Sequence, residues 1–285
     1  MKSLHDVPAP AKLNLFLHVT GRRADGMHLL QSAFMLVDWC DTLHFELRAG
    51  GNLSREDLGA VLPADDLVLR AARALKAGTG TDCGAHIAID KQVPSQAGMG
   101  GGSSDAATCL LALNRLWRLG LGRHDLARIG ATLGADVPFF LFGRNAWAEG
   151  TGDELSTVAV PAARFAVAWP GAGLDTAKVF RDELLKRNTP AAIISGFAAN
   201  PHGFGANDLQ PVAQRLCPAV GHAVQWLASQ GLQPRMTGSG SAVFALMPPG
   251  KILAQAPSSW RVRECSNMEV HPLAGWAPSD DSVGG

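Results

Sequence analysis

The chain contains no tyrosine in its 285 residues, so no phenolic hydroxyl can take part in its chemistry. It also has no excess of either charge, because 25 lysine and arginine residues match 25 aspartate and glutamate residues. Nucleic-acid-binding domains usually carry a strongly basic surface. The charge balance therefore disfavours a DNA- or RNA-binding function, and we expect no nucleic-acid partner.

Long apolar runs and secretory signals are missing as well. No hydrophobic stretch reaches the roughly 18 residues that a membrane span needs, and no secretory pattern opens the sequence. The cysteines are odd in number and show no C-x-x-C spacing, which indicates reduced thiols and not a disulfide framework or a zinc site; they are Cys40, Cys83, Cys109, Cys217 and Cys265. We expect a cytoplasmic protein that has no membrane partner.

The hydrophobic periodicity predicts strands and helices in an irregular order. Strands are expected at residues 10–20, 42–48, 86–91, 165–169 and 243–247. Helices are expected at residues 66–76, after the serines at 103–104, and at 123–133, 176–186 and 211–229. Because no regular strand–helix–strand rhythm appears, the pattern favours an α+β fold. We predict two domains, residues 1–158 and residues 159–285.

A glycine-rich run occupies residues 94–104 (PSQAGMGGGSS) and passes directly into an apolar-periodic helix. Glycine lets a ligand approach the main chain closely, and a helix start offers unpaired N–H groups. Together they predict an anion cradle, most simply for the phosphates of a nucleotide. Ser103 or Ser104 is expected to cap the helix. The plainer alternative is a flexible loop that only turns the chain.

This run fits none of the common phosphate loops. It lacks the lysine of G-x-x-x-x-G-K-[ST], and Ser103 stands where G-x-G-x-x-G needs its last glycine. The H-R-D and D-F-G motifs of protein kinases are missing from the sequence. The run therefore matches none of these three nucleotide-binding patterns, and the flexible loop stays the plainer alternative.

Two further segments carry polar groups in apolar surroundings. In the strand at 10–20, Lys12 and Asn14 point to the same side and could meet one ligand, although on spacing alone solvent-facing residues are the simpler interpretation. Asp136 follows a predicted helix and precedes the run Phe-Phe-Leu-Phe, where partial burial would require a cationic partner, although aspartate is also common in turns. Lys12 is the candidate partner.

Together with the glycine run, four segments resemble the GHMP kinase superfamily over nearly the whole chain. They are residues 10–15 (PAKLNL), 23–31 (RADGMHLLQ), 133–138 (LGADVP) and 237–240 (TGSG). The resemblance implies the two-domain GHMP kinase fold, with an N-terminal ATP-binding α+β domain, a C-terminal α+β substrate domain and an active-site cleft between them. It is strongest to the branch that transfers the γ-phosphoryl group of ATP to the 2-hydroxyl of a cytidine-diphosphate-linked methylerythritol, in the non-mevalonate route to isoprenoid precursors.

The resemblance also implies roles for individual residues. Asp136 would be the general base, and Lys12 would orient it and stabilise charge. The residues implied to hold ATP are Lys91, Pro94, Ser95, Gln96, Ala97, Gly98, Met99, Gly100, Gly101, Gly102, Ser103 and Ser104. The residues implied to hold the cytidine substrate are Asn14, His28, Thr176 and Phe180. Mg²⁺ is implied as the cofactor of ATP, with Ser104 and Asp136 as open candidates for its ligands.

Three positions depart from the family pattern. Met27 replaces the usual aromatic residue before the histidine, Asp65-Asp66 replaces an asparagine-containing pair on the adenine side, and Ala177 replaces a proline. A thioether still packs on a ring through polarisable contact, so we expect looser stacking with retained binding.

Alternative functions stay open at this point. Another small-molecule GHMP kinase, such as a homoserine or mevalonate-type kinase, would share the phosphate loop. A catalytically silent nucleotide-binding protein would share the fold. We expect a monomer or a weak homodimer.

Overall fold

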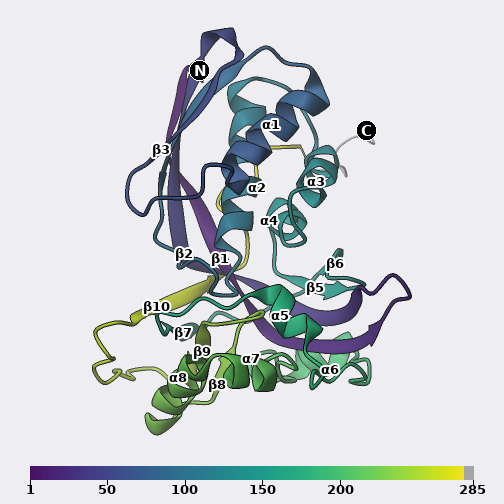
Figure 1. Cartoon of the computed structure of the whole chain (residues 1–285), viewed down its shortest axis with the longest axis vertical. Coiled ribbons are helices and arrows are strands. Elements are labelled where there is room, and N and C mark those ends of the chain that lie inside the picture. The colour runs from purple at the N-terminus through teal and green to yellow at the C-terminus, as the bar shows by residue number, and fades with distance from the viewer. Residues whose placement is uncertain (279–285) are drawn as a thin grey trace.

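The computed structural model describes residues 1–278 (Figure 1). The elements before residue 158 are β1 (Ser3–Arg22), β2 (His28–Arg48), the 3₁₀ turn η1 (Ala49–Gly51), β3 (Leu53–Asp57), α1 (Leu67–Thr79), β4 (Gly84–Asp90), α2 (Gly101–Leu116), α3 (Arg123–Ala131), α4 (Val137–Phe142), β5 (Ala146–Glu149) and β6 (Glu154–Thr157). The later elements are β7 (Arg164–Trp169), α5 (Thr176–Arg181), α6 (Ile194–Ala199), α7 (Gln210–Leu216), α8 (Pro218–Ser229), β8 (Pro234–Met236), β9 (Val243–Met247) and β10 (Arg261–Met268).

One mixed sheet runs through the molecule in the order β3-β4-β2-β10-β7-β9-β8, while β1 and β5 also pair with β2 and β6 pairs with β5. Most pairs are antiparallel, and β3 with β4 is parallel. The long strands β1 and β2 extend from the upper to the lower part of the molecule in Figure 1. The α+β prediction is confirmed. The predicted domain boundary at 158/159 falls between β6 and β7 and stays a prediction. The last seven residues of the predicted second domain lie outside the described range.

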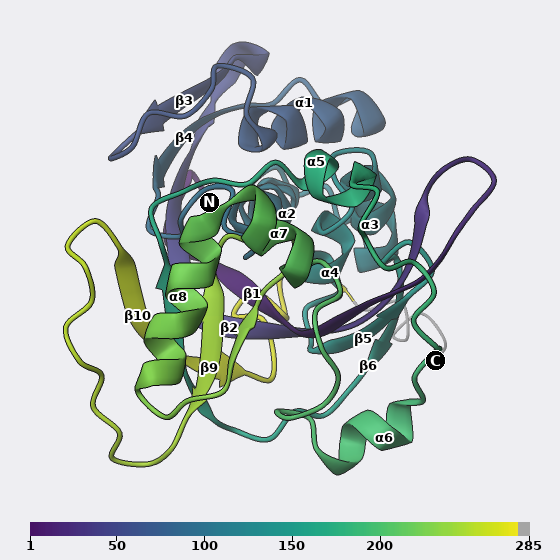
Figure 2. The same cartoon turned by 60° about the horizontal axis from the view of Figure 1, so that its bottom comes forward.

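Apolar side chains gather in three clusters. The first lies between the sheet and α1 to α4, and Phe45, Leu75, Leu110 and Phe140 are among its buried members. The second joins β1 and β2 to β7 and the glycine-rich run. The third lies between β7 and β9 and the helices α7 and α8, which the turned view of Figure 2 brings to the front. The cleft described below lies where these clusters meet.

Several predicted elements are confirmed with small changes at their ends. The strand at 10–20 is part of β1, and the strand at 243–247 coincides with β9. The helix expected at 66–76 begins one residue later, because Asp66 is its N-cap and accepts a hydrogen bond from the Leu69 N–H. It continues to Thr79 and ends at Gly80, which adopts the left-handed conformation (φ 68°).

Three helix predictions are wrong in detail. The helix expected at 211–229 is two helices, because the residue before Pro218 is driven to an extended conformation and Pro218 starts α8. The helix expected at 176–186 ends at Arg181, and Asp182 is extended. Neither serine caps α2, because Gly100 in a left-handed conformation (φ 70°) is its N-cap. Within residues 1–278, no helix combines the length and apolar character of a membrane span.

Candidate active site

The predicted site residues line one cleft of about 1370 Å³. The cleft brings together Lys12, Asn14, His28, Lys91, Asp136, Thr176, Phe180 and every residue from Pro94 to Ser103. Ser104 is fully buried behind this surface. Residues from β1, β2, α2, α4 and α5 therefore converge, although they are far apart in the sequence.

Lys12 and Asp136 lie next to each other, as the sequence hypothesis required. The distance from Lys12 Nζ to Asp136 Oδ2 is 3.5 Å. Lys12 comes from β1 and is only 3% exposed, whereas Asp136 is the N-cap of α4 and its side chain is about one-third exposed. The interpretation of Lys12 as a solvent-facing strand residue is therefore wrong. A buried ammonium now faces a carboxylate that is accessible to a ligand.

Asn14 anchors Lys12 on its other side. Its Oδ1 accepts a hydrogen bond from Lys12 Nζ at 2.5 Å, and its Nδ2 donates to Ser32 Oγ at 2.8 Å. Its backbone N–H donates to Thr237 Oγ1 at 2.9 Å. Because the amide oxygen accepts from a donor and the amide nitrogen donates to an acceptor, the orientation of the Asn14 side chain is fixed. Asn14 in turn holds the Lys12 side chain in place.

The glycine-rich run adopts conformations that other residues rarely take. Gly98 and Gly100 have φ values of 73° and 70°. A Cβ at Gly98 would lie 2.2 Å from the Thr237 carbonyl oxygen, and one at Gly100 would lie 2.9 Å from Phe140 Cζ. The run is thus pressed between α4 and the turn at residues 237–240, and the unpaired N–H groups of the first turn of α2 follow it.

Backbone hydrogen bonds fix the run to its neighbours. Lys12 N–H donates to the Met99 carbonyl at 2.9 Å, and Ala242 N–H donates to the Ala97 carbonyl at 3.1 Å. Ser241 N–H donates to the Gln96 carbonyl at 3.3 Å. The cradle is therefore held from both halves of the chain, unlike the flexible loop that the sequence left as an alternative.

Lys91 is enclosed by two buried carboxylates beneath the start of α2. Its Nζ lies 2.6 Å from Asp105 Oδ2 and also contacts Asp41. Asp41 accepts hydrogen bonds from the Gln92 and Val93 N–H groups at 2.6 and 2.7 Å. Burial opposes the charge on Lys91, but Asp105 and Asp41 outweigh it and raise the lysine pKa, while burial raises the pKa of Asp105. This cluster ties the end of β4 to α2.

At the other end of the cleft, His28 and Phe180 face each other. Their ring centroids are 5.1 Å apart and the rings are tilted by 41°. Arg187 Nε donates to His28 Nε2 at 3.0 Å, and its Nη2 donates to the Phe180 carbonyl at 2.9 Å. Burial lowers the pKa of His28, and the charges of Arg187 and Arg22 lower it further. The neutral imidazole can accept the guanidinium N–H at this nitrogen.

Thr176 and Met27 complete this end. Thr176 Oγ1 shares a hydrogen bond of 2.6 Å with Ser239 Oγ, which links α5 to the turn at residues 237–240. The side chain of Met27 lines the cleft and is largely exposed. It is therefore free to pack on a group that enters the cleft.

Sequence reasoning missed several residues that shape the cleft. The T-G-S-G motif was noticed, but Thr237 and Ser239 were not included among the site residues. Arg187, Leu62, Pro63 and Val68 also line the cleft, beside the Asp65-Asp66 pair that the sequence placed on the adenine side. Thr237 and Arg187 are held by hydrogen-bond partners more than a hundred positions away, Asn14 and His28, and a single sequence carries no signal for such contacts.

The residues present suit a metal ion held mainly by phosphate oxygens. Residues 1–278 contain no group of three or more histidine, cysteine, aspartate or glutamate side chains able to hold a metal on their own. Asp136 is the carboxylate beside the loop at the cleft surface, and Ser104 Oγ is a buried hydroxyl with no partner within the described chain. Mg²⁺ commonly takes one or two protein oxygens together with substrate phosphates, so these groups fit that cation.

Comparison with known proteins gives a consistent answer. The model of the GHMP kinase N-terminal domain matches residues 66–144, and that of the C-terminal domain matches residues 183–261. A 4-diphosphocytidyl-2-C-methyl-D-erythritol kinase from Variovorax paradoxus (strain S110) is 65% identical over 97% of this chain and 100% of its own length.

Solved structures agree with this result. A crystal structure of 4-(cytidine 5'-diphospho)-2C-methyl-D-erythritol kinase superposes with a TM-score of 0.75 at 32% identity, covering 91% of this chain and 98% of that one. A homoserine kinase from Cytophaga hutchinsonii has a TM-score of 0.68 at 15% identity, covering 95% and 96% of the two chains. The second likeness concerns the fold alone.

Proposed function

The chain belongs to the GHMP kinase family, and on this basis we propose that it phosphorylates the 2-hydroxyl of 4-diphosphocytidyl-2-C-methyl-D-erythritol with ATP. The reaction is a step of the non-mevalonate pathway to isoprenoid precursors. The observation that carries the proposal is the full-length similarity to kinases of that name. A GHMP kinase uses ATP, generally with Mg²⁺.

In the proposed reaction the acceptor hydroxyl lies between Asp136 and the terminal phosphate of ATP. Asp136 accepts the hydroxyl proton while the oxygen bonds to the γ-phosphorus and the bond to the β-phosphate oxygen breaks, releasing ADP. Lys12, 3.5 Å from Asp136, orients the carboxylate and stabilises the negative charge on the transferring group. Asn14 holds the lysine in place.

The nucleotide and the acceptor would occupy opposite ends of the cleft. Pro94 to Ser104, with the first N–H groups of α2, would hold the phosphates, and Lys91 would lie beside the nucleotide. His28, Phe180 and Thr176 would hold the cytidine end, with Met27 covering the ring. Mg²⁺, when bound to the phosphates beside Asp136 and Ser104, would neutralise charge on them.

An acceptor comparison with the purified chain tests the proposal. ADP release is measured with ATP and, in turn, the cytidine-linked substrate, homoserine and mevalonate. We expect turnover with the cytidine-linked substrate alone. Turnover with homoserine or mevalonate would favour another GHMP kinase activity. ATP binding without turnover on any acceptor would favour a silent nucleotide-binding protein.

A further inference from the structure

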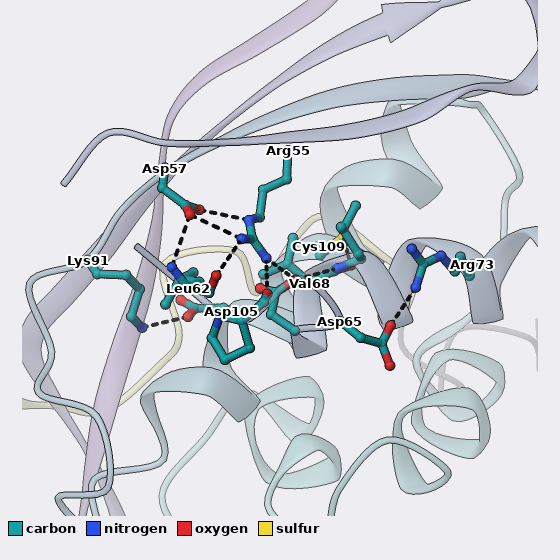
Figure 3. Close-up of polar contacts among 12 residues, drawn as sticks. Arg55, Asp57, Leu62, Asp65, Val68, Arg73, Lys91, Asp105 and Cys109 are labelled. Atoms are coloured by element: carbon teal, nitrogen blue, oxygen red, sulfur yellow. Dashed lines mark hydrogen bonds and ion pairs between the residues drawn. The ribbon is translucent and has the colours of Figure 1, made fainter. Parts of the chain in front are cut away.

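Arg55, on β3, is a buried cation that no part of the proposed reaction uses. Its side chain is only 8% exposed. Its guanidinium contacts Asp57 through Nε at 2.7 Å and through Nη2 at 3.1 Å (Figure 3). It also contacts Asp66 through Nη1 at 2.7 Å. A planar guanidinium that meets carboxylates in this way is held in one orientation.

The same guanidinium also holds the backbone of the segment that connects β3 to α1. Nη1 donates to the Pro63 carbonyl at 2.9 Å, and Nη2 donates to the Leu62 carbonyl at 3.1 Å. The Leu62 N–H in turn donates to Asp57 Oδ2 at 3.0 Å. Burial opposes ionisation of Asp57, but the Leu62 N–H and Arg55 outweigh it and lower the carboxyl pKa. Arg55 thus fixes the segment at its middle and, through Asp66, at the start of α1.

This segment forms one end of the cleft. The residues that line it, here called the 62–68 wall, are Leu62, Pro63, Asp65, Asp66, Leu67 and Val68. The wall adjoins the glycine-rich run, because a Cβ at Gly102 would lie 3.5 Å from Leu67 Cδ1. The wall leads into α1 in the upper part of Figure 1, whereas Thr176 and Phe180 of the candidate cytidine residues belong to α5 in the lower part.

The chemistry of ATP then determines what the wall contacts. With the triphosphate on the glycine-rich run and its terminal phosphate toward Lys12 and Asp136, the nucleoside must extend away from the acceptor. The 62–68 wall is the cleft surface that adjoins the glycine-rich run on the side away from the acceptor. We propose that Arg55 is a positioning residue for the donor nucleotide, which acts by holding the 62–68 wall against the nucleoside of ATP; this rests on the proposed kinase function.

A second arginine that pairs with an aspartate of the same wall provides a matched control. Arg73 pairs with Asp65 at 2.5 Å, but their side chains are 56% and 70% exposed (Figure 3). Exposed pairs of this kind contribute little to rigidity. If the buried contacts of the Arg55 guanidinium position the wall, then the same substitution at Arg55 and at Arg73 should have different effects.

The test compares Arg55→Lys with Arg73→Lys in the full chain, with separate KM values for ATP and for the cytidine-linked acceptor. Lysine keeps the charge but cannot bridge two carboxylates and two carbonyls. We expect Arg55→Lys to raise the KM for ATP about tenfold, the effect of losing roughly one hydrogen bond. The KM for the acceptor and kcat should stay within about twofold, and Arg73→Lys should match the wild type on every measure.

Other outcomes overturn the inference. An unchanged KM for ATP in Arg55→Lys would do so, as would equal rises for ATP and acceptor, or equal effects of the two substitutions. Asp57→Asn offers a milder change to the same contacts if Arg55→Lys does not fold, and it should shift the KM for ATP in the same direction. Direct binding of ATP to each variant keeps the inference separate from the proposed function, because it is readable even if the wild type does not use the cytidine-linked acceptor.

Discussion

At the scale of single residues, the proposed reaction depends on a short chain of contacts: Ser32 to Asn14, Asn14 to Lys12, and Lys12 to Asp136. Each member limits the freedom of the next. A buried lysine costs free energy unless it is paired, and here an amide oxygen and a carboxylate share the ammonium. Asp136, at the accessible end of the chain of contacts, is left to meet the substrate.

Replacing Asp136 by asparagine tests its proposed role as the base. Asp136→Asn keeps the size of the side chain but cannot accept the hydroxyl proton, so turnover should fall by about two to four orders of magnitude. ATP affinity should change little. Asp125→Asn, which alters an exposed aspartate on α3 paired with Arg128, is the control and should retain full turnover. Turnover retained in Asp136→Asn would remove this residue from the base role.

Arg187 connects the two candidate residues of the cytidine end. It donates to His28 Nε2 and to the Phe180 carbonyl, which come from different halves of the chain. Arg187→Met should therefore raise the KM for the cytidine-linked substrate about tenfold, as expected for the loss of one good hydrogen bond. The KM for ATP should be unaffected. Arg215→Met, which removes an arginine that pairs with Asp182 near the surface, is the control; a shift of the KM for ATP would contradict the assignment.

Part of the site could be predicted at this scale and part could not. The common direction of Lys12 and Asn14 follows from strand alternation, and the need of Asp136 for a cation follows from its apolar surroundings. Their contact, across 124 positions, could be stated from the sequence only as a hypothesis, because spacing along the chain does not give spatial closeness. Arg55 and Arg187 gave no sequence signal, because an arginine in an ordinary polar stretch is identical whether it faces water or a buried carboxylate.

At the scale of elements, the glycine-rich run functions together with the turn at residues 237–240. Thr237 Oγ1 donates to the Gly98 carbonyl at 3.3 Å, and Asn207 Nδ2 donates to the Met236 and Gly238 carbonyls at 2.8 Å. The run therefore takes its shape from a segment that begins 139 positions later. Composition predicts that glycine is needed here, but only the fold shows which backbone presses against it.

Gly98→Ala should disturb this contact strongly. The new Cβ would lie 2.2 Å from the Thr237 carbonyl oxygen, so the run must move away from the turn, and the KM for ATP should rise at least tenfold. Gly80→Ala is a matched control, because Gly80 has a similar φ of 68° at the end of α1 and open space around it. Both substitutions should lose about 1–2 kcal/mol from the left-handed conformation. Equal KM values for ATP in the two variants would refute the packing argument.

Helix boundaries show where local patterns end and tertiary contacts take over. Asp66 ends the loop before α1 because it caps the helix, a signal that can be read from sequence. The end of α5 at Arg181 could not be read in this way. Arg187 donates hydrogen bonds to the carbonyls of Phe180 and Asp182, and the chain turns there. A contact of this kind overrides the helical periodicity that continues to residue 186.

At the scale of the whole molecule, the end of the chain returns to the first half. β10 pairs with β7 along most of its length and then with β2 through Asn267–Val37 and Met268–Leu36. After it, Leu273 and Ala277 enter the apolar cluster beneath α1 to α4. No pattern in the last residues predicts this return, because the pairing joins strands about 230 positions apart. The two halves should consequently unfold together.

His271 lies at this junction, and we expect it to make the junction sensitive to acid. Its side chain is buried, its Nδ1 accepts the Leu273 N–H at 3.1 Å, and its backbone N–H donates to the Gly143 carbonyl at 2.9 Å. Burial, with a smaller effect of the Arg123 charge, lowers its pKa to about 3. In the unfolded chain the pKa is about 6.5. Between these values the unfolded state binds a proton that the folded state rejects.

The free energy of unfolding should therefore fall as the pH drops below about 6.5, with a contribution from His271 of up to about 1.4 kcal/mol per pH unit. His271→Asn keeps an acceptor for the Leu273 N–H and removes the titrating group. Urea unfolding at pH 7.5 and 5.5 should show a clearly smaller loss on acidification in His271→Asn than in the wild type. His124→Asn, at an exposed site on α3, should lose as much as the wild type. If His271→Asn loses as much unfolding free energy on acidification as the wild type, the acid sensitivity arises elsewhere and the junction tolerates a charged imidazole.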